Sequence, residues 1–218
     1  MISSRVLRNL RENLASEDPW SLDTNPYEQT RYELMLDLIR AKGGLYESAL
    51  EIGCAAGSFT VRLLSLCKKL HVMDCQARAI ERCRQRVGNQ AEVRFSVADI
   101  SDCMGLDDSY DLIVVSEVLY YLETVRLVSA TVRTIGSWLR PEGVLIFGSL
   151  NDAITSRWGW PGAETTILEW SKNLREVDRR TCGGAGPCEH ATIVKFVRGK
   201  TQDCTGQPPI ACAAHGGR

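Results

Sequence analysis

The residues from 49 to 59 contain the side chains and spacings best suited to hold a ligand. An apolar run ends in an acid, continues through small residues with two glycines, and enters an amphipathic segment at Ser58. This pattern predicts a strand, a tight loop and a helix. Glycine lets such a loop bend sharply and lets a ligand approach the backbone. The first N–H groups of the helix favour an anion or a carboxylate as that ligand.

The glycine spacing distinguishes between two classes of nucleotide ligand. A dinucleotide fingerprint has glycine at its first, third and sixth positions, where this chain has Gly53, Ala55 and Ser58. Glycine instead recurs at Gly57, and Glu51 stands two residues before the first glycine. The stretch therefore resembles motif I of the class I methyltransferases that use S-adenosylmethionine (SAM), with Ala55 in place of the middle glycine. A glycine-containing turn of an ordinary α/β sheet is the alternative interpretation.

Two further predicted strands also end in an acid. Residues 69–74 end at Asp74, where a carboxylate can accept hydrogen bonds from the hydroxyls of a ribose. Residues 91–100 alternate like a strand and end in Asp99 and Ile100. In the methyltransferases that this chain resembles, the acid at the latter position binds the adenine amino group, and the next backbone N–H meets the ring. Together the three acids favour an adenosine-containing ligand.

The apolar run that begins at Tyr110 predicts a central parallel strand buried on both faces. It ends at Ser116 and Glu117, so these side chains should emerge at the carboxyl edge of the sheet, where open α/β sheets bind ligands. We expect Ser116 to contact the cofactor. An ordinary helix cap is the alternative role for Glu117.

The other elements follow from periodicity and from capping residues. Asn25 is a suitable helix N-cap and Pro26 suits the first helical position. We predict helices over 2–14, from Pro26 onward, and over 77–87, 125–139 and 162–173, with a turn at 140–143 and further strands at 144–148, 174–181 and 191–197. The last two strands should form an antiparallel hairpin. The predicted fold is α/β and Rossmann-like, a seven-stranded, mostly parallel sheet whose last strand is antiparallel, with helices on both faces.

This order predicts an N-terminal helical lid over 1–44, a SAM-binding domain over 45–198 whose segment 150–190 faces the substrate, and a disordered tail over 199–218. We expect Trp20 and Arg31 of the lid to contact the cofactor. Packing of the lid helix onto the sheet is an equal alternative for Trp20 and for Tyr27.

Composition limits the class of protein. The chain has 218 residues, of which 44% are hydrophobic and 24% charged, and this suits one domain with a full core. A formal charge of −1 argues against nucleic acid as a partner. An apolar run long enough to span a membrane and a secretory leader are both missing, which predicts a cytoplasmic protein without a membrane partner. Nine scattered cysteines, an odd number, favour reduced thiols over disulfides, and their spacing predicts no metal site.

A closer resemblance covers residues 16–198. Its most specific segments are 157–159 and 162–165, and it also includes 18–20, 25–29 and 51–57. These segments resemble the rhizobial nodulation methyltransferases of the NodS family. The resemblance implies a SAM-dependent N-methyltransferase that acts on the free amine of the non-reducing-end glucosamine of a deacetylated chitooligosaccharide, in Nod factor biosynthesis, with S-adenosylhomocysteine as the second product.

An amine acceptor assigns candidate roles around the end of the central strand. The amine must be neutral and held in line with the methyl carbon, and positioning can supply most of the acceleration. A nearby carboxylate can accept the leaving proton. We expect Glu117 to do so, with Tyr120 or Tyr121 orienting the amine. Trp158, Trp160 and Glu164 are the candidate substrate-binding residues, although core packing is an equal alternative for the indoles.

Two other functions remain open. The chain could methylate another small-molecule acceptor, or it could bind SAM without catalysis. The sequence gives no indication of the oligomeric state.

Overall fold

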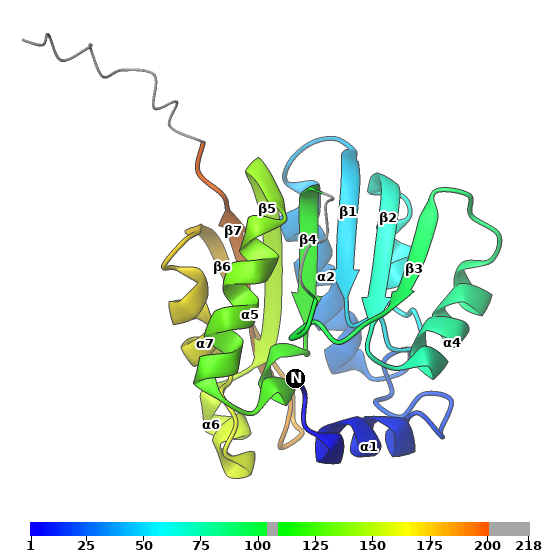
Figure 1. The fold of residues 1–218 in the computed structure, drawn as a ribbon, viewed down its shortest axis with the longest axis vertical. Helices are drawn as coiled ribbons and strands as arrows, with labels where there is room; N and C mark the ends of the chain where they lie inside the picture. Colours follow the sequence, from blue (N-terminus) through cyan, green and yellow to red (C-terminus); the bar gives the residue numbers. More distant parts are fainter. Residues whose placement is uncertain (104–108, 201–218) are drawn as a thin grey trace, which may run out of the picture.

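The sheet supplies the frame on which the site is built. The computed structural model describes residues 1–103 and 109–200, so most of the predicted tail lies outside the described residues. One seven-stranded sheet has the order β3-β2-β1-β4-β5-β7-β6 (Figure 1). Its strands are β1 (Tyr46–Ile52), β2 (Cys67–Asp74), β3 (Val93–Val97), β4 (Tyr110–Ser116), β5 (Leu139–Leu150), β6 (Arg175–Gly183) and β7 (His190–Val197).

Strands β1 to β5 pair in parallel, and β7 runs antiparallel to both of its neighbours. This confirms the predicted mostly parallel sheet with an antiparallel last strand. All five parallel strands therefore place their carboxyl ends at one edge of the sheet, the lower edge in Figure 1.

Helices cover both faces of the sheet. They are α1 (Ser4–Asn13), α2 (Pro26–Arg40), α3 (Thr60–Leu63), α4 (Ala77–Val87), α5 (Val125–Ser137), α6 (Asp152–Thr155) and α7 (Ala163–Trp170), with 3-10 turns η1 (Leu119–Leu122) and η2 (Ser156–Trp158). Helices α2, α3 and α4 pack on one face and α5 and α7 on the other. In β1, Ala49 faces the core beneath α2, α3 and α4, and Leu50 and Ile52 face the core beneath α5 and α7. Alternate side chains of a strand point to opposite faces, so a continuous apolar run suits this central position.

Helix α2 begins as its sequence predicts. The side chain of Asn25 accepts a hydrogen bond from the N–H of Tyr27 at 2.9 Å, and Pro26 occupies the first helical position. Both features fix the start of the helix because they satisfy or remove N–H groups that lack a partner within it.

Helix α1 lies across the carboxyl edge of the sheet, at the bottom of Figure 1. The N–H of Ile2 donates to the carboxylate of Asp99 at 2.9 Å, and the side-chain amide of Gln76 donates to the carbonyl of Leu7 at 3.2 Å. These contacts attach α1 to the loops that follow β3 and β2.

The prediction of a turn at 140–143 before a strand at 144–148 is wrong in its boundaries. Strand β5 begins at Leu139, which pairs with Tyr110, and the register then shifts before Leu112 pairs with Val144. Glu142 has a φ of 62°, so the chain does bend there. The irregularity is a bulge within the strand because pairing resumes on both sides of it. The preceding helix consequently ends at Ser137.

None of the helices in residues 1–103 and 109–200 is long and apolar enough to cross a membrane.

Candidate active site

A cavity of about 610 Å³ opens at the carboxyl ends of β1, β2 and β4. Most of the residues predicted to bind a cofactor line it, namely Trp20, Arg31, Glu51, Gly53, Ala55, Asp74, Ile100 and Ser116. Five predicted catalytic or substrate-binding residues also line it, namely Glu117, Tyr120, Tyr121, Trp158 and Trp160. The sheet topology thus brings together side chains that are far apart in the sequence. Gly57, Asp99 and Glu164 are not among the residues that line this cavity.

The loop after β1 has three residues in the left-handed region. The φ angles are 84° at Gly53, 48° at Ala55 and 84° at Gly57. A Cβ atom at Gly53 would lie 2.2 Å from a methyl carbon of Val118, and one at Gly57 would lie 3.0 Å from the Cys83 sulfur. Gly53 therefore lets the loop pack closely against Val118, and Gly57 lets it pack closely against α4. Ala55 keeps the conformation that a middle glycine would adopt, at some cost in strain.

Asp74 supports the same loop from the end of β2. Its carboxylate accepts hydrogen bonds from the N–H of Ala55 at 3.2 Å and from the N–H of Gln76 at 2.8 Å. Burial raises the pKa of Asp74 to about 6, and these backbone N–H groups oppose the rise. A carboxylate has about four acceptor positions, so Asp74 can still accept hydrogen bonds from hydroxyl groups in the cavity.

The side chains of Asp99 and Glu164 form hydrogen bonds with other residues of the chain. Asp99 accepts hydrogen bonds from Ile2 and from both the N–H and the hydroxyl of Ser101. Glu164, in the first turn of α7, accepts a hydrogen bond from the N–H of Asp152 at 2.6 Å. Glu164 thereby anchors the start of the segment that presents Trp158 and Trp160 to the cavity.

Arg31 of α2 is a buried cation on the cavity wall, with 2% of its side chain exposed. Its guanidinium donates to the Glu28 carboxylate and to the Ser116 hydroxyl, and lies 4.0 Å from Oε1 of Glu117. Glu28 also lines the cavity. The sequence prediction missed Glu28, although its spacing of three residues from Arg31 on a helix was a usable signal.

Glu117 is held in an unusual backbone conformation, with a φ of 56°. Its N–H donates to the carbonyl of Gly148 at 2.9 Å, and its Oε2 accepts a hydrogen bond from the N–H of Leu150 at 3.2 Å. Its Oε1 is buried and has no hydrogen-bond partner among the described residues. One carboxylate oxygen is therefore fixed by the sheet, and the other is left for a further donor. A non-glycine residue persists at such a φ only where its surroundings enforce it.

The pKa of the Glu117 carboxyl lies near neutral pH. Burial raises the pKa of its carboxyl to about 7, against the lowering effect of the Arg31 guanidinium. A carboxylate with this pKa can accept a proton and release it near neutral pH.

Aromatic rings form the wall beside Glu117. The Tyr120 and Trp160 rings are nearly parallel, with centroids 6.3 Å apart, and the Trp158 ring lies 5.5 Å from that of Trp160. Tyr121 lies 5.7 Å from Trp160. Trp158 is 45% exposed, so the row of rings runs from the buried carboxylate toward the surface.

The turn between β6 and β7 also reaches the cavity; it lies within the segment 150–190 predicted to face the substrate, although none of its residues was predicted individually. Gly186, Pro187, Cys188 and Glu189 line it. The Glu189 carboxylate accepts a hydrogen bond from the side-chain amide of Asn25 at 3.0 Å and joins this turn to the start of α2. A glycine-rich connection gives no sequence signal for such a distant contact.

Comparison with known proteins identifies the family. Residues 3–202 match the family described as Nodulation protein S (NodS). Nodulation protein S of Bradyrhizobium diazoefficiens is 44% identical over 190 residues, which cover 87% of this chain and 90% of that protein. Nodulation protein S of Sinorhizobium fredii is 44% identical over 88% of each chain. The chain belongs to the NodS family.

Solved structures agree with this assignment. The crystal structure of N-methyltransferase NodS from Bradyrhizobium japonicum WM9 in complex with S-adenosylhomocysteine superposes with a TM-score of 0.85 at 39% identity, over 88% of this chain and 98% of that one. Magnesium protoporphyrin IX methyltransferase from Synechocystis has a TM-score of 0.64 at 13% identity, over 88% of this chain and 94% of that one, which supports the fold alone. The fold is the class I methyltransferase fold, as the motif I stretch predicts.

The raised pKa of Glu117 predicts how stability depends on pH. Its folded-state pKa of about 7 exceeds its ordinary 4.5, so between these values the folded chain holds a proton that the unfolded chain has lost. Stability from this group is complete below pH 4.5 and is lost as the pH rises through 7. Relative to Glu117→Gln, the free energy of unfolding of the wild type should therefore fall over this range, as measured by urea denaturation at several pH values. A wild type that gains stability over Glu117→Gln as the pH rises would contradict the raised pKa.

Proposed function

We propose that this chain is a SAM-dependent N-methyltransferase that methylates the free amine of the non-reducing-end glucosamine of a deacetylated chitooligosaccharide, in Nod factor biosynthesis. Membership of the NodS family supports the reaction class, since a member at 39% identity is an N-methyltransferase crystallised with S-adenosylhomocysteine. The observation that carries the proposal is the position of Glu117, which lines the same cavity as the motif I loop and whose Oε1 has no hydrogen-bond partner among the described residues.

The residues of the cavity fit SAM. The small residues Gly53 and Ala55 of the motif I loop line the cavity, and Glu51 has a buried carboxyl oxygen without a hydrogen-bond partner within the described part of the chain. Burial raises the pKa of Glu51, so this acid is a potential hydrogen-bond donor as well as an acceptor. We assign Glu51, Gly53, Ala55, Asp74 and Ile100 to the cofactor. Gly57 and Asp99 support these residues indirectly, because they stabilise the loops that follow β1 and β3.

SAM, when bound, supplies a methyl group on a sulfonium sulfur for displacement by a neutral amine. Glu117 accepts the proton that the amine loses, through its free Oε1. Arg31 keeps Glu117 in place and stabilises its ionised form, while Ser116 and Trp20 complete the wall toward the cofactor. Methyl transfer should slow below about pH 7, because there Glu117 holds its own proton.

The aromatic wall suits a sugar. Trp158 and Trp160 offer faces on which pyranose rings can stack, and Tyr120 and Tyr121 lie between them and Glu117. We assign these residues to the acceptor. Glu164 contributes to acceptor binding indirectly, because its hydrogen bond with the N–H of Asp152 holds the segment that carries Trp158 and Trp160 in place.

The division of the chain follows from these assignments. We propose that residues 1–44 form a lid, because residues of both α1 and α2 line the cavity. Residues 45–198 form the SAM-binding domain, and 150–190 its substrate side. The seven cysteines that the structure describes are all free, which suits the reducing cytoplasm that we propose as the location.

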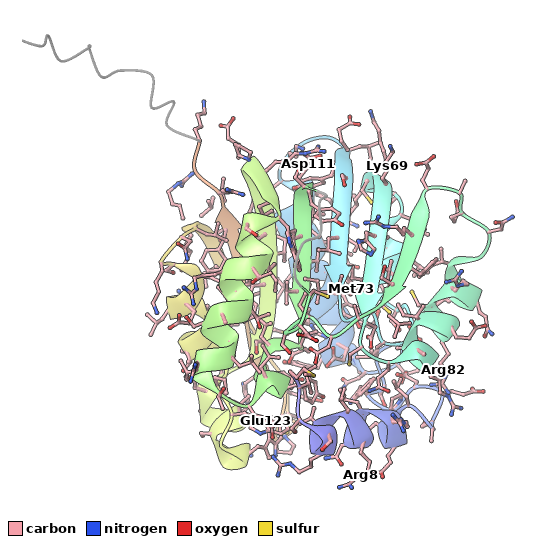
Figure 2. All side chains as sticks on the ribbon, in the orientation of Figure 1. Arg8, Lys69, Met73, Arg82, Asp111 and Glu123 are labelled. Atoms are coloured by element: carbon pink, nitrogen blue, oxygen red, sulfur yellow. The ribbon has the colours of Figure 1, made fainter. Side chains whose placement is uncertain are left out.

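Asp74→Ala should weaken SAM binding by about 2–3 kcal/mol, because the ribose hydroxyls lose a charged partner. Isothermal titration calorimetry measures this directly. Asp111→Ala is the matched control, since Asp111 lies at the opposite edge of the sheet (Figure 2) and accepts hydrogen bonds from Arg140 and Ser48. The control should lose stability and keep its affinity. Unchanged affinity in Asp74→Ala would remove Asp74 from the cofactor site.

The acceptor is tested with methyl-labelled SAM and a chitooligosaccharide deacetylated at its non-reducing end, beside the fully acetylated sugar. Label should enter the deacetylated sugar alone, because acetylation delocalises the nitrogen lone pair into the amide carbonyl and leaves the nitrogen without nucleophilic character. Transfer to a different small molecule, with none to this sugar, would favour another acceptor. Binding of SAM without transfer to any acceptor would favour a non-catalytic SAM-binding protein.

A further inference from the structure

Tyr27, in the first turn of α2, has a polar atom that the fold does not explain. The residue lines the cavity and is 7% exposed, and its hydroxyl is buried with no hydrogen-bond partner in the part of the chain that the structure describes. A buried tyrosine hydroxyl usually has a partner, and leaving one without costs about 1–3 kcal/mol. We therefore expect the hydrogen-bond partner of this hydroxyl to be a molecule bound in the cavity.

The backbone of Tyr27 is fixed on both sides. Its N–H donates to the side chain of Asn25 at 2.9 Å, and its carbonyl accepts a hydrogen bond from the Cys182 thiol of β6 at 3.8 Å. Asn25 is held in turn by Glu189. The phenol is thus attached to a rigid junction between α2 and the β6–β7 hairpin.

The surroundings of Tyr27 place it on the acceptor side of the cavity. Tyr27 lies one helical turn before Arg31 on α2, and the Arg31 guanidinium is 4.0 Å from Oε1 of Glu117; Tyr27 and Glu117 both line the cavity. Burial, with the negative charge of Glu117, raises the pKa of Tyr27. The phenol therefore remains a hydrogen-bond donor at neutral pH.

Tyr27 and Glu117 both line the cavity, and each has a buried oxygen with no hydrogen-bond partner among the described residues, a donor in the Tyr27 hydroxyl and an acceptor in Oε1 of Glu117. A reacting amine needs its lone pair for the methyl carbon, so it can donate to Glu117 and cannot also accept from Tyr27. The hydrogen from Tyr27 must go to an oxygen atom beside the amine. A sugar bearing an amine next to a hydroxyl has this arrangement.

We propose that Tyr27 is an acceptor-binding residue whose hydroxyl donates a hydrogen bond to an oxygen of the sugar next to the amine that Glu117 serves. This rests on the proposed function. It assigns to the lid a part in substrate recognition, through a hydroxyl that has no hydrogen-bond partner in residues 1–103 and 109–200.

The test compares Tyr27→Phe with Tyr46→Phe, which remove the same atom from two buried tyrosines. The Tyr46 hydroxyl donates to the carbonyl of Ile39 at 3.1 Å and is not on the cavity wall. Tyr46→Phe should therefore lower the melting temperature and leave methyl transfer unchanged. Tyr27→Phe should keep its melting temperature and its SAM affinity, and its kcat/KM for the deacetylated sugar should fall about tenfold.

Four outcomes would overturn the proposal. Unchanged kcat/KM in Tyr27→Phe would show that the hydroxyl does not contact the acceptor, and weaker SAM binding would assign it to the cofactor. A shift in the pH midpoint of the rate, without a change in KM, would mean that Tyr27 acts through Glu117. A wild type that transfers no methyl group to the sugar would overturn the proposed function and this inference together, and that result is visible before any variant is compared.

Discussion

The site depends on the burial of one positive charge. Arg31 lies inside the protein with 2% of its side chain exposed, and a buried guanidinium is tolerated only where anions and acceptors surround it. Glu28 from the same helix and Ser116 and Glu117 from the end of β4 supply them. Because these partners come from two elements, neutralising Arg31 also fixes α2 against the carboxyl edge of the sheet. The same contacts define one wall of the cavity.

Glu117 has two features that reduce stability and prepare it for a ligand. Its backbone adopts a left-handed conformation that disfavours a side chain, and one of its carboxylate oxygens is buried without a hydrogen-bond partner among the described residues. Both features reduce stability and suit a residue kept for a ligand. Leu150 holds the other oxygen, so the free one has a defined direction. Tyr27 is similar on α2, because its backbone N–H and carbonyl are hydrogen-bonded while its hydroxyl has no partner in the part of the chain that the structure describes.

Local signals in the sequence predicted the frame and most of the residues that line the cavity. The glycine spacing after β1, the acids at strand ends and the Asn25 cap all act within a few residues, so they can be read directly. The partners of Glu164 and Asp99 could not be predicted, because Asp152 and Ile2 meet them only through the fold. The bulge in β5 was missed for the same reason, since a turn sequence can lie within a strand when pairing with Tyr110 extends it. Tyr27 was predicted only as part of the lid, because nothing in its sequence context shows that its hydroxyl lacks a partner.

The central claim is that the free oxygen of Glu117 receives the proton of the amine. The most direct test measures kcat with the deacetylated sugar and the SAM dissociation constant for Glu117→Gln, which keeps the shape of the side chain and removes its basicity. Turnover should fall by about two orders of magnitude or more, while SAM affinity changes little. Equal losses of turnover and affinity would contradict the claim and make Glu117 a cofactor ligand.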